Sequence, residues 1–316
     1  MKLNVASTSK VNKLEGHLLK RILNYKYYYL MLLPLIAWYI VFCYIPMYGV
    51  TLSFKTYNFS EGILGSPWVG LRNFEELFVD LGFRNALKNT LILSLGKLLF
   101  HFPVPLILAI LINEIGRSKL KKFYQTVFTF PHFISWIVLS GVIFNIFSQN
   151  GVFNQLIDLF GWESTSVLVE KEYFRPLIYI SYIWKEMGWD SIIYLAALAG
   201  INPEFYEASE IDGANRFQRI LYITWPCLRS TTAILLILSV GSIMNGVGFD
   251  QIFNLYSAPV YAVADTIDTY IYRSTFGVGM DFGYSTAIGF VKSLVNLVLI
   301  WIANVAIKRM GEDGLF

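Results

Sequence analysis

The hydropathy pattern of this chain consists of long apolar runs separated by polar connections. A helix needs about 20 apolar residues to cross roughly 30 Å of hydrocarbon. Runs that meet this length lie at 29–50, 89–112, 126–147, 176–200, 231–249 and 284–307. The first run is too long for the apolar core of a signal peptide and lacks a small-residue cleavage site, so we expect it to remain as a helix. The pattern therefore predicts an all-α polytopic membrane protein with six transmembrane helices.

Lys and Arg residues are distributed unevenly among the polar connections. Cytoplasmic loops of membrane proteins carry an excess of these residues. With the amino terminus inside, 15 of them lie on the cytoplasmic side and seven lie on the other side, in longer segments. We therefore expect both termini in the cytoplasm and extracytoplasmic segments at 51–88, 148–175 and 250–283.

The same distribution divides the chain into three parts. We expect a basic cytoplasmic segment at 1–28, a transmembrane domain at 29–308 and a cytoplasmic tail at 309–316. Leu alternates with Lys and Arg between Lys13 and Lys26, a pattern that fits either a helix on the inner membrane surface or a simple positive flank.

Composition supports the membrane assignment and excludes other classes of protein. Hydrophobic residues make up 55% of the chain and charged residues 15%, and the mean hydropathy of +0.52 lies outside the balance of soluble domains. The net charge of +3 is small and scattered between apolar runs, so it does not indicate a nucleic-acid partner. Membrane lipid is the expected surrounding. Cys43 and Cys227 lie in different environments and predict neither a disulfide nor a metal site.

Motifs of catalysis and nucleotide binding are missing from the sequence. It contains no G-x-x-x-x-G-K-[ST] phosphate loop, no nucleophile elbow and no cluster of metal ligands. The three histidines stand far apart, at 17, 101 and 132. We therefore expect a transport subunit and not an enzyme, with no catalytic residue, no metal and no cofactor of its own.

The connection at 201–228, between the fourth and fifth apolar runs, carries the most informative pattern. Asn202 can cap a helix whose first residue is Pro203, because the missing N–H group costs nothing at that position. Glu204 would then lie near the positive end of the helix dipole. Gly213 can adopt the left-handed conformation that ends a helix. The sequence therefore predicts a short helix and a glycine turn at the inner membrane surface.

A second helix is predicted to follow the glycine turn. Asn215 can cap this helix, and Pro226 is expected to stop it. Three apolar side chains fall on one face at helical spacing: Phe217, Ile220 and Leu221. Two short helices joined by a tight turn would be rigid enough to transmit a movement to the membrane domain.

Several residues of this connection resemble the EAA loop of bacterial binding-protein-dependent ABC importers, whose pattern is roughly E-A-A, three residues, G, nine residues, I, one residue and L-P. The matching residues are Glu207-Ala208-Ser209, Asp212-Gly213-Ala214, Ile223 and Pro226. Ser209 replaces the second alanine of the pattern, and Trp225 replaces its leucine. The resemblance implies that the loop docks on a separate ATP-hydrolysing subunit, with Glu207 at the contact and Gly213 at the bend.

Other segments resemble permeases for complex oligosaccharides within the maltose-transporter-like group, and this similarity runs from about residue 28 to the carboxyl terminus. Examples are Pro46-Met47-Tyr48-Gly49, Trp68-Val69-Gly70-Leu71-Arg72-Asn73-Phe74, Ile183-Trp184-Lys185 and Gly248-Phe249-Asp250-Gln251-Ile252. The resemblance implies the type I ABC importer permease fold in the cytoplasmic (inner) membrane of a bacterium. It also implies an oligosaccharide or polysaccharide substrate.

Partner proteins follow from the same resemblance. It implies a second, related permease subunit, two ATPase subunits that bind ATP and Mg, and an extracytoplasmic solute-binding protein. The sequence alone leaves open whether the two permeases are identical and which of them holds the sugar.

Charged residues within the fourth apolar run indicate a substrate path. Ionisable groups inside a membrane are costly and usually face a cavity or one another. Glu186 and Asp190 lie one helical turn apart, and Lys185 can offset a charge. Carboxylates beside aromatic rings suit a sugar, so we expect the path at Trp184, Glu186, Trp189 and Asp190. Weaker candidates, for which interhelical hydrogen bonding or packing is the alternative explanation, are His132, Trp136, Asn145, Asn245 and Asp250.

An ion-coupled secondary transporter is the alternative function, in which Glu186 and Asp190 would relay protons. Such carriers often contain inverted repeats and broken helices in both halves, and the sequence shows neither pattern. A structural or sensory membrane protein would explain the apolar runs but not the loop at 201–228.

Overall fold

The computed structural model describes residues 24–161, 163–164, 166–245, 247–277, 281–309 and 311. Helices dominate these residues, and the only strand-like contact among them is one isolated bridge between Lys55 and Trp68. The predicted all-α fold class is confirmed. The basic segment at 1–28, with its Lys13–Lys26 pattern, and the tail at 309–316 lie largely outside the described residues.

Five helical stretches are long and apolar enough to cross a membrane. They are built from α2 (Lys26–Tyr39), η1 (Ile40–Tyr44) and η2 (Ile45–Phe54); α5 (Leu81–His101) and α6 (Pro103–Asn113); α8 (Trp136–Phe147) and α9 (Val152–Leu159); α12 (Arg216–Arg219), η4 (Ile220–Thr224) and α13 (Trp225–Gly241); and α17 (Phe282–Arg309). The run expected at 176–200 forms α10 (Lys171–Ala199), whose 29 residues are long enough. Three charged residues near its middle reduce its apolar character, so the count of six spans stays a prediction.

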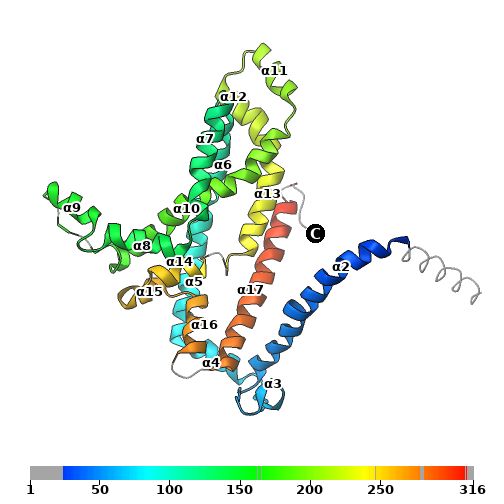
Figure 1. The fold of residues 1–316 in the computed structure, drawn as a ribbon, viewed down its shortest axis with the longest axis vertical. Coiled ribbons are helices and arrows are strands. Elements are labelled where there is room, and N and C mark those ends of the chain that lie inside the picture. Colours follow the sequence, from blue (N-terminus) through cyan, green and yellow to red (C-terminus); the bar gives the residue numbers. More distant parts are fainter. Residues whose placement is uncertain are drawn as a thin grey trace, which may run out of the picture.

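Shorter elements connect these stretches. They are α3 (Gly62–Gly65), α4 (Arg72–Val79), α7 (Ser118–Thr129), η3 (Phe130–Phe133), α11 (Pro203–Ile211), α14 (Phe249–Leu255), η5 (Ala258–Val260), α15 (Tyr261–Ala264) and α16 (Ile267–Phe276). Figure 1 shows α11 and α12 at one end of the molecule and α3 and α4 at the opposite end.

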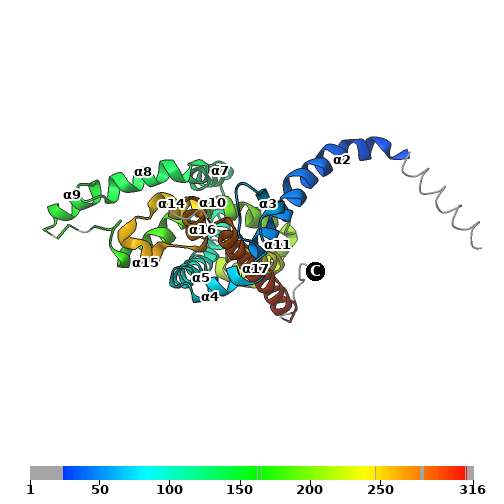
Figure 2. The ribbon, with the colours of Figure 1, turned by 90° about the horizontal axis from the view of Figure 1, so that it is seen from below.

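Helix α10 is the central element of the bundle. It packs against α5, α6, α7 and η3, and it also contacts α13 and α15. The largest cluster of buried apolar side chains joins α10 to α5, α8 and α14, and a second cluster joins α4 and α5 to α16 and α17. In contrast, α2 projects away from the bundle without a buried residue (Figures 1 and 2), while η2 packs on α17.

The predicted span at 126–147 is not one continuous helix. α7 ends at Thr129, η3 follows as a 3₁₀ turn, and α8 starts at Trp136. Pro131 lacks the N–H group that a continuous helix would use. The backbone at Ser135 is extended, and its hydroxyl accepts a hydrogen bond from the N–H of the third residue of α8 at 3.3 Å. A proline and a serine cap therefore divide this apolar run.

The prediction that Pro226 stops a helix is wrong. α12, η4 and α13 form one continuous helix. η4 is a π-helical turn, after which the N–H of Trp225 bonds to the carbonyl of Ile220, five residues earlier. The wider turn accommodates the proline that follows it. The same arrangement precedes Pro46, where η1 is also a π-helical turn.

The predicted span at 231–249 ends earlier than expected. α13 ends at Gly241, residues 242–245 form turns, and α14 begins at Phe249. Gly248 has a φ of +77°, a conformation that residues with a Cβ rarely adopt. After this departure from the helix, α14 packs against α8 in the main apolar cluster.

Asp80 connects three elements at the α4 end of the molecule. As the N-cap of α5, its carboxylate accepts hydrogen bonds from the N–H of Gly82 at 2.7 Å, from the hydroxyl of Tyr284 at 2.5 Å and from the hydroxyl of Tyr270. Partial burial raises the pKa of the Asp80 carboxyl, but these hydrogen bonds, together with the N–H of Phe83, outweigh burial. The net effect lowers its pKa below the ordinary value.

We expect the stability that Asp80 provides to disappear in acid. Because its folded pKa lies below the unfolded value of about 3.9, the contribution is complete above that pH and is lost as the pH falls through the folded pKa. Asp80→Ala should lower the melting temperature of the purified protein at neutral pH, and the difference from wild type should shrink below about pH 4. Tyr284→Phe should show a smaller difference with the same trend. A difference that does not change with pH would contradict the charged state of this anchor.

Helices α10 and α7 meet backbone to backbone at Gly188. A methyl group at this position would collide with the carbonyl group of Phe128 and the N–H of Thr129, and small residues permit such close crossings in membranes. Gly188→Ala should therefore destabilise the protein by about 1–3 kcal/mol, the usual cost of overpacking, as measured by thermal unfolding in detergent. Gly289→Ala on α17 is the matched control, since nothing lies within 4 Å of its Cβ position. Equal shifts for both variants would contradict the close crossing.

Candidate functional site

The loop at 201–228 begins with the predicted capped helix. The side-chain oxygen of Asn202 accepts a hydrogen bond from the N–H of Glu204 at 3.1 Å, and Pro203 is the first residue of α11. Gly213 follows α11 with a φ of +77°. The cap and the left-handed turn are both present, so the local sequence determines where this helix begins and ends.

A second cap and an ion pair fix α12 against α11. Asn215 and Gln218 form a capping box, in which the N–H of Gln218 donates to the Asn215 side chain at 2.9 Å and the N–H of Asn215 donates to the Gln218 side chain at 2.8 Å. Arg219 on α12 forms an ion pair with Glu210 on α11. These contacts make the α11–α12 hairpin a compact unit that continues directly into α13.

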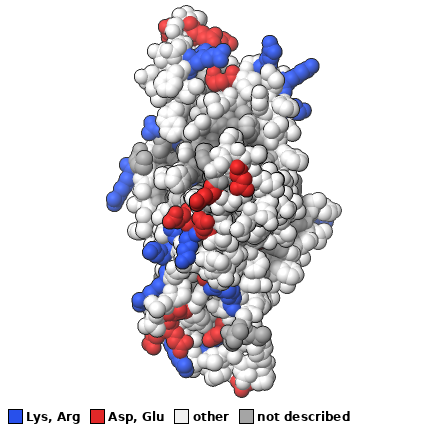
Figure 3. Space-filling model, turned by 90° about the vertical axis from the view of Figure 1, so that its left-hand side faces the viewer, with Lys and Arg blue, Asp and Glu red and all other residues white. Residues whose placement is uncertain are grey.

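The α11–α12 hairpin forms an exposed end of the molecule. Neither helix contains a buried residue, and Ile211 and Phe217 are 88% and 72% exposed. Charged side chains of both signs accompany these apolar residues at this end, as the upper part of Figure 3 shows. Large exposed apolar side chains within a charged surface indicate a contact site for another protein.

The residues predicted for coupling lie on this hairpin and at its base. Glu207, Ala208, Asp212, Gly213 and Pro226 are exposed, whereas Ser209 and Ile223 are half-buried. The hydroxyl of Ser209 donates to the carbonyl of Tyr206 at 2.7 Å, so the serine that departs from the EAA pattern is accommodated within α11. Ile223 and Pro226 lie where the hairpin joins α13.

Glu186 on α10 is at the centre of a charged cluster. Its carboxylate lies 3.1 Å from Nζ of Lys185 and 2.6 Å from Nδ1 of His132 on η3. Lys185 also donates to the backbone carbonyl of His132 at 2.5 Å, and its Nζ lies 5.6 Å from the ring centre of Trp136. The His132 ring stacks on Trp189 with centroids 4.2 Å apart. The structure thus brings four of the predicted path residues together: His132, Trp136, Glu186 and Trp189.

Asp190, one turn further along α10, contacts a different helix. Its Oδ2 lies 2.8 Å from Nε2 of His101, the last residue of α5. The two predicted carboxylates therefore have separate partners, because Glu186 contacts η3 and Asp190 contacts α5. Together the two carboxylates attach α10 to η3 and to the end of α5.

The remaining predicted path residues lie elsewhere. Trp184 lines an apolar cavity of about 550 Å³ between α8, α9 and α10. Asn145 is exposed on α8, where its amide donates to a carbonyl of the same helix at 3.0 Å. Asn245 is exposed in the turn after α13, and Asp250 is exposed in the first turn of α14. None of these four joins the charged cluster.

Lys97 on α5 forms a second polar group, which we call the Lys97 hub, with Gln251, Val247 and Tyr182. The ammonium of Lys97 donates to Oε1 of Gln251 at 2.6 Å and to the carbonyl of Val247, and it lies 3.8 Å from the ring centre of Tyr182. The amide of Gln251 donates in turn to the carbonyl of Ile178 at 2.8 Å. The hub joins α5, α10 and α14 inside the protein.

Lys97, His101 and Gln251 are absent from the sequence-based predictions of the path. Lys97 and His101 stand four residues apart within the apolar run at 89–112, and ionisable residues at this spacing inside a span signal a shared polar contact. Gln251 offers no such signal, because its side-chain partners Lys97 and Ser181 lie 154 and 70 residues away in the sequence.

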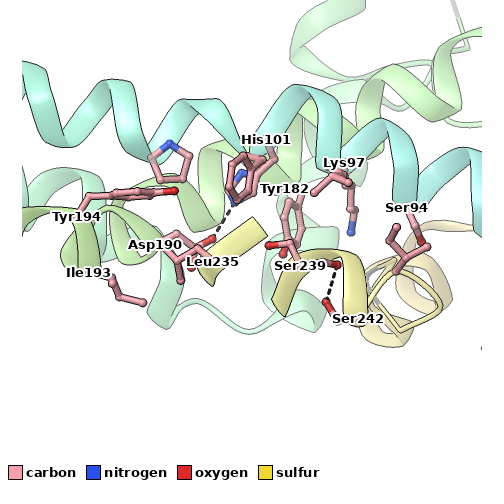
Figure 4. A pocket seen from close by; sticks show the side chains of 14 residues that line it. Ser94, Lys97, His101, Tyr182, Asp190, Ile193, Tyr194, Leu235, Ser239 and Ser242 are labelled. Atoms are coloured by element: carbon pink, nitrogen blue, oxygen red, sulfur yellow. Dashed lines mark hydrogen bonds and ion pairs between the residues drawn. The ribbon is translucent and has the colours of Figure 1, made fainter. Parts of the chain in front are cut away.

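A polar cavity of about 150 Å³ lies between α5, α10 and α13 (Figure 4). Its polar lining consists of Ser94, Lys97, His101, Tyr182, Asp190, Tyr194, Ser239 and Ser242. Figure 4 shows the hydrogen-bonded side chains of His101 and Asp190 toward one end and Lys97 and Ser94 toward the other. Among the described residues, no three His, Cys, Asp or Glu side chains gather closely enough to hold a metal ion.

The family model described as "Binding-protein-dependent transport system inner membrane component" matches residues 101–312 of this chain. The chain is also similar to the polygalacturonan/rhamnogalacturonan transport system permease protein YteP of Bacillus subtilis (strain 168). The identity is 41% over 300 residues, which cover 95% of this chain and 93% of YteP. Protein LplB of the same organism is 42% identical over 292 residues, covering 92% of this chain and 91% of LplB.

Solved structures extend this similarity to the fold. A chain from the crystal structure of a bacterial ABC transporter involved in the import of the acidic polysaccharide alginate has a TM-score of 0.85 and 41% identity, covering 93% of this chain and 99% of that one. A chain from the bacterial alginate ABC transporter in complex with alginate pentasaccharide-bound periplasmic protein has the same TM-score and 40% identity, covering 94% and 99%. These chains share the helical arrangement described here over nearly its whole length.

We expect Glu186→Gln to destabilise the protein strongly, because Lys185 would lose its counter-ion while remaining buried. Breaking a buried ion pair by removing one partner typically costs about 3–5 kcal/mol. The double variant Lys185→Met/Glu186→Gln should recover part of this loss, and thermal unfolding of wild type, Lys185→Met, Glu186→Gln and the double variant gives the coupling energy. Losses that simply add would contradict a direct interaction between the two side chains.

Proposed function

The chain belongs to the family of binding-protein-dependent transport system inner membrane components, and on this premise we propose that it is the permease subunit of an ATP-binding-cassette (ABC) importer for oligosaccharides or polysaccharides. Its apolar helices and its family place it in the inner membrane as a multi-pass protein. As a permease subunit it is not itself an enzyme. ATP hydrolysis then takes place on a separate chain.

The relatives support an acidic carbohydrate as the cargo. YteP is named for polygalacturonan and rhamnogalacturonan, and the structural neighbours belong to a transporter of the acidic polysaccharide alginate. These polymers have in common uronate units, which carry carboxylates. Because identity of about 40% extends over nearly the whole of this chain, we assign the same class of cargo to it.

The proposed complex contains further subunits. One structural neighbour is in complex with a pentasaccharide-bound periplasmic protein, which supports an extracytoplasmic solute-binding protein as a partner of this chain. We further propose a second, related permease beside it and two ATPase subunits, which bind ATP and Mg, below it. No residue of α2 is buried by the rest of the chain. This exposed surface supports the proposal that another subunit or lipid covers the helix.

The observation that carries the proposal is the α11–α12 hairpin. It is exposed and held together by two caps and an ion pair, and it carries the residues that match the EAA pattern except Ile223 and Pro226, which lie at its base. In the proposed complex this hairpin docks on an ATPase subunit, with Glu207 at the contact. The hairpin, the amino terminus and the carboxyl terminus then face the cytoplasm.

Movement of the hairpin would reach the polar cavity through two helices. α11 follows α10 after a short connection, and α12 continues through η4 into α13. The hydroxyls of Tyr206 and Thr224, 3.0 Å apart, connect α11 to the base of α13. Because α10 and α13 both line the cavity, a shift of the docked hairpin would change its shape. ATP-driven closure of the ATPase pair would thereby favour one of two access states.

The alternative, an ion-coupled secondary transporter, would use the carboxylate–histidine pairs of Glu186 and Asp190 as proton relays. It leaves the exposed hairpin without a partner, and membership of an importer family argues against it. Uptake that continues without ATP and stops when the proton gradient is dissipated would favour this alternative.

We expect Gly213→Pro and Glu207→Lys to uncouple ATP hydrolysis from uptake while the protein still inserts. Proline cannot adopt the φ of +77° at position 213, and a lysine at position 207 reverses the charge at the docking contact. In the importer assembled in nanodiscs, each change should reduce the stimulation of ATPase activity by loaded binding protein about tenfold, equivalent to a loss of about 1.4 kcal/mol.

Glu75→Lys provides the matched control for charge reversal. Glu75 is exposed on α4, at the opposite end of the molecule from the hairpin. This variant should retain stimulation of ATPase activity and uptake. Normal uptake by both Gly213→Pro and Glu207→Lys would remove the coupling role of the hairpin.

A further inference from the structure

The polar cavity between α5, α10 and α13 contains groups that the proposed coupling mechanism does not use. Its volume of about 150 Å³ is well below the roughly 300–1,000 Å³ of sites that enclose a drug-sized ligand. This space suits one functional group of a ligand with its hydrogen-bonding neighbours, not a whole oligosaccharide. The chemistry of its walls therefore indicates which group it accepts.

Two polar atoms on the α5 wall have no hydrogen-bond partner among the described residues: Oγ of Ser94 and Nδ1 of His101. Ser94 is 3% exposed and His101 is 9% exposed. Buried polar atoms in proteins nearly always bond to protein, water or ligand. Both residues line the cavity, and Lys97 lies between them on the same face of α5 (Figure 4).

Lys97 differs from the two other lysines that are buried or half-buried in the membrane helices. Lys185 pairs with Glu186, and Lys292 pairs with Asp268. The acceptors of Lys97 in the hub are an amide oxygen and a backbone carbonyl, and no described carboxylate lies within ion-pair distance. A buried ammonium without a counter-ion is much more costly than a paired one. A ligand carboxylate at this cavity would supply the missing negative charge.

We propose that the cavity is a subsite for the carboxylate of one uronate unit during transport. This inference rests on the acidic carbohydrate cargo proposed above. Lys97 and the hydroxyl of Ser94 donate to the carboxylate, and such charge-assisted hydrogen bonds are the strong ones. Toward the other end, His101 donates from Nε2 to Asp190 and presents Nδ1 as an acceptor for a sugar hydroxyl. Donors at one end and acceptors at the other match a sugar unit that carries both a carboxylate and hydroxyls.

Uptake by the assembled importer in proteoliposomes tests the subsite with two sugars. The galacturonate trisaccharide and its carboxyl-reduced counterpart differ only in the carboxylates. Lys97→Met should reduce uptake of the acidic trisaccharide about 10- to 100-fold, the effect of losing a hydrogen bond to a charged group, and should change uptake of the reduced one much less. Lys97→Arg keeps the charge and should retain most of the uptake.

Lys292→Met is the matched control for this experiment. It also removes a lysine from a membrane helix, but Lys292 lies outside the cavity and pairs with Asp268. Any loss it causes should be equal for the two trisaccharides, because it acts through stability and not through the ligand carboxylate.

A labelling measurement with the binding protein omitted tests the contact directly. In the complex assembled with Ser94→Cys, Cys43→Ser and Cys227→Ser, a small methanethiosulfonate reagent should modify the thiol at position 94. The galacturonate trisaccharide should slow this modification, and the carboxyl-reduced trisaccharide should not. Adding Lys97→Met should abolish the protection.

Each outcome separates the subsite from the proposed function. Any of three results would overturn the subsite and leave Lys97 a structural role. Lys97→Met could reduce uptake of both sugars equally, both sugars could protect the thiol equally, or the thiol could fail to react at all. If wild type imported neither sugar while the acidic one still protected the thiol, the proposed cargo would fail and the subsite would stand. If wild type imported the acidic sugar, but this sugar did not protect the thiol and Lys97→Met did not change its uptake, the proposed cargo would stand and the subsite would fail.

Discussion

The hydrogen bonds of the buried Gln251 side chain, which reach both α5 and α10, are the interaction on which the interior of this protein depends. In a bilayer, apolar side chains gain little by leaving lipid for protein, so polar contacts and close packing hold helices together. Gln251 is completely buried and contacts α5 through Lys97 and α10 through Ile178 and Ser181. Lys97 also satisfies the carbonyl of Val247, in the stretch where the chain has left the helix. Irregular backbone at membrane depth is tolerated only when the protein supplies such partners.

Helix α10 extends this polar support along the length of the molecule. Its carboxylates hold η3 and the end of α5, its backbone carbonyl at Ile178 receives Gln251, and Gly188 lets α7 approach closely. Apolar clusters fill the spaces between these contacts. The helix carries more charge near its middle than an isolated span would tolerate. The fold accommodates these charges because each charged group has a partner on a neighbouring element. One helix therefore connects the exposed hairpin, the charged cluster and the polar cavity.

Local rules explain why much of the fold could be predicted from the sequence. The caps of α11 and α12 and the turn at Gly213 depend on residues only a few positions apart, and apolar runs of span length need no knowledge of the tertiary fold. The site was harder to predict, because its contacts depend on how helices pack. His101 and Asp190 are 89 residues apart in the sequence, and Lys97 and Gln251 are 154 residues apart. The prediction at Pro226 is wrong because the rule for proline assumes α-helical hydrogen bonding, which η4 replaces with π-helical hydrogen bonding.

The π-turn η4 also determines the azimuth of the α11–α12 hairpin around the axis of α13. A π-turn contains about one residue more than an α-helical turn, and one residue corresponds to about 100° of rotation around a helix. The extra residue between Arg219 and Trp225 therefore sets the angle around the axis of α13 at which the hairpin leaves the bundle. A chain shorter by one residue here would keep the same helices and the same exposed side chains. These side chains would, however, point in a different direction around the axis of α13. The length of this turn thus specifies the direction of the hairpin as firmly as the caps on the hairpin specify its fold.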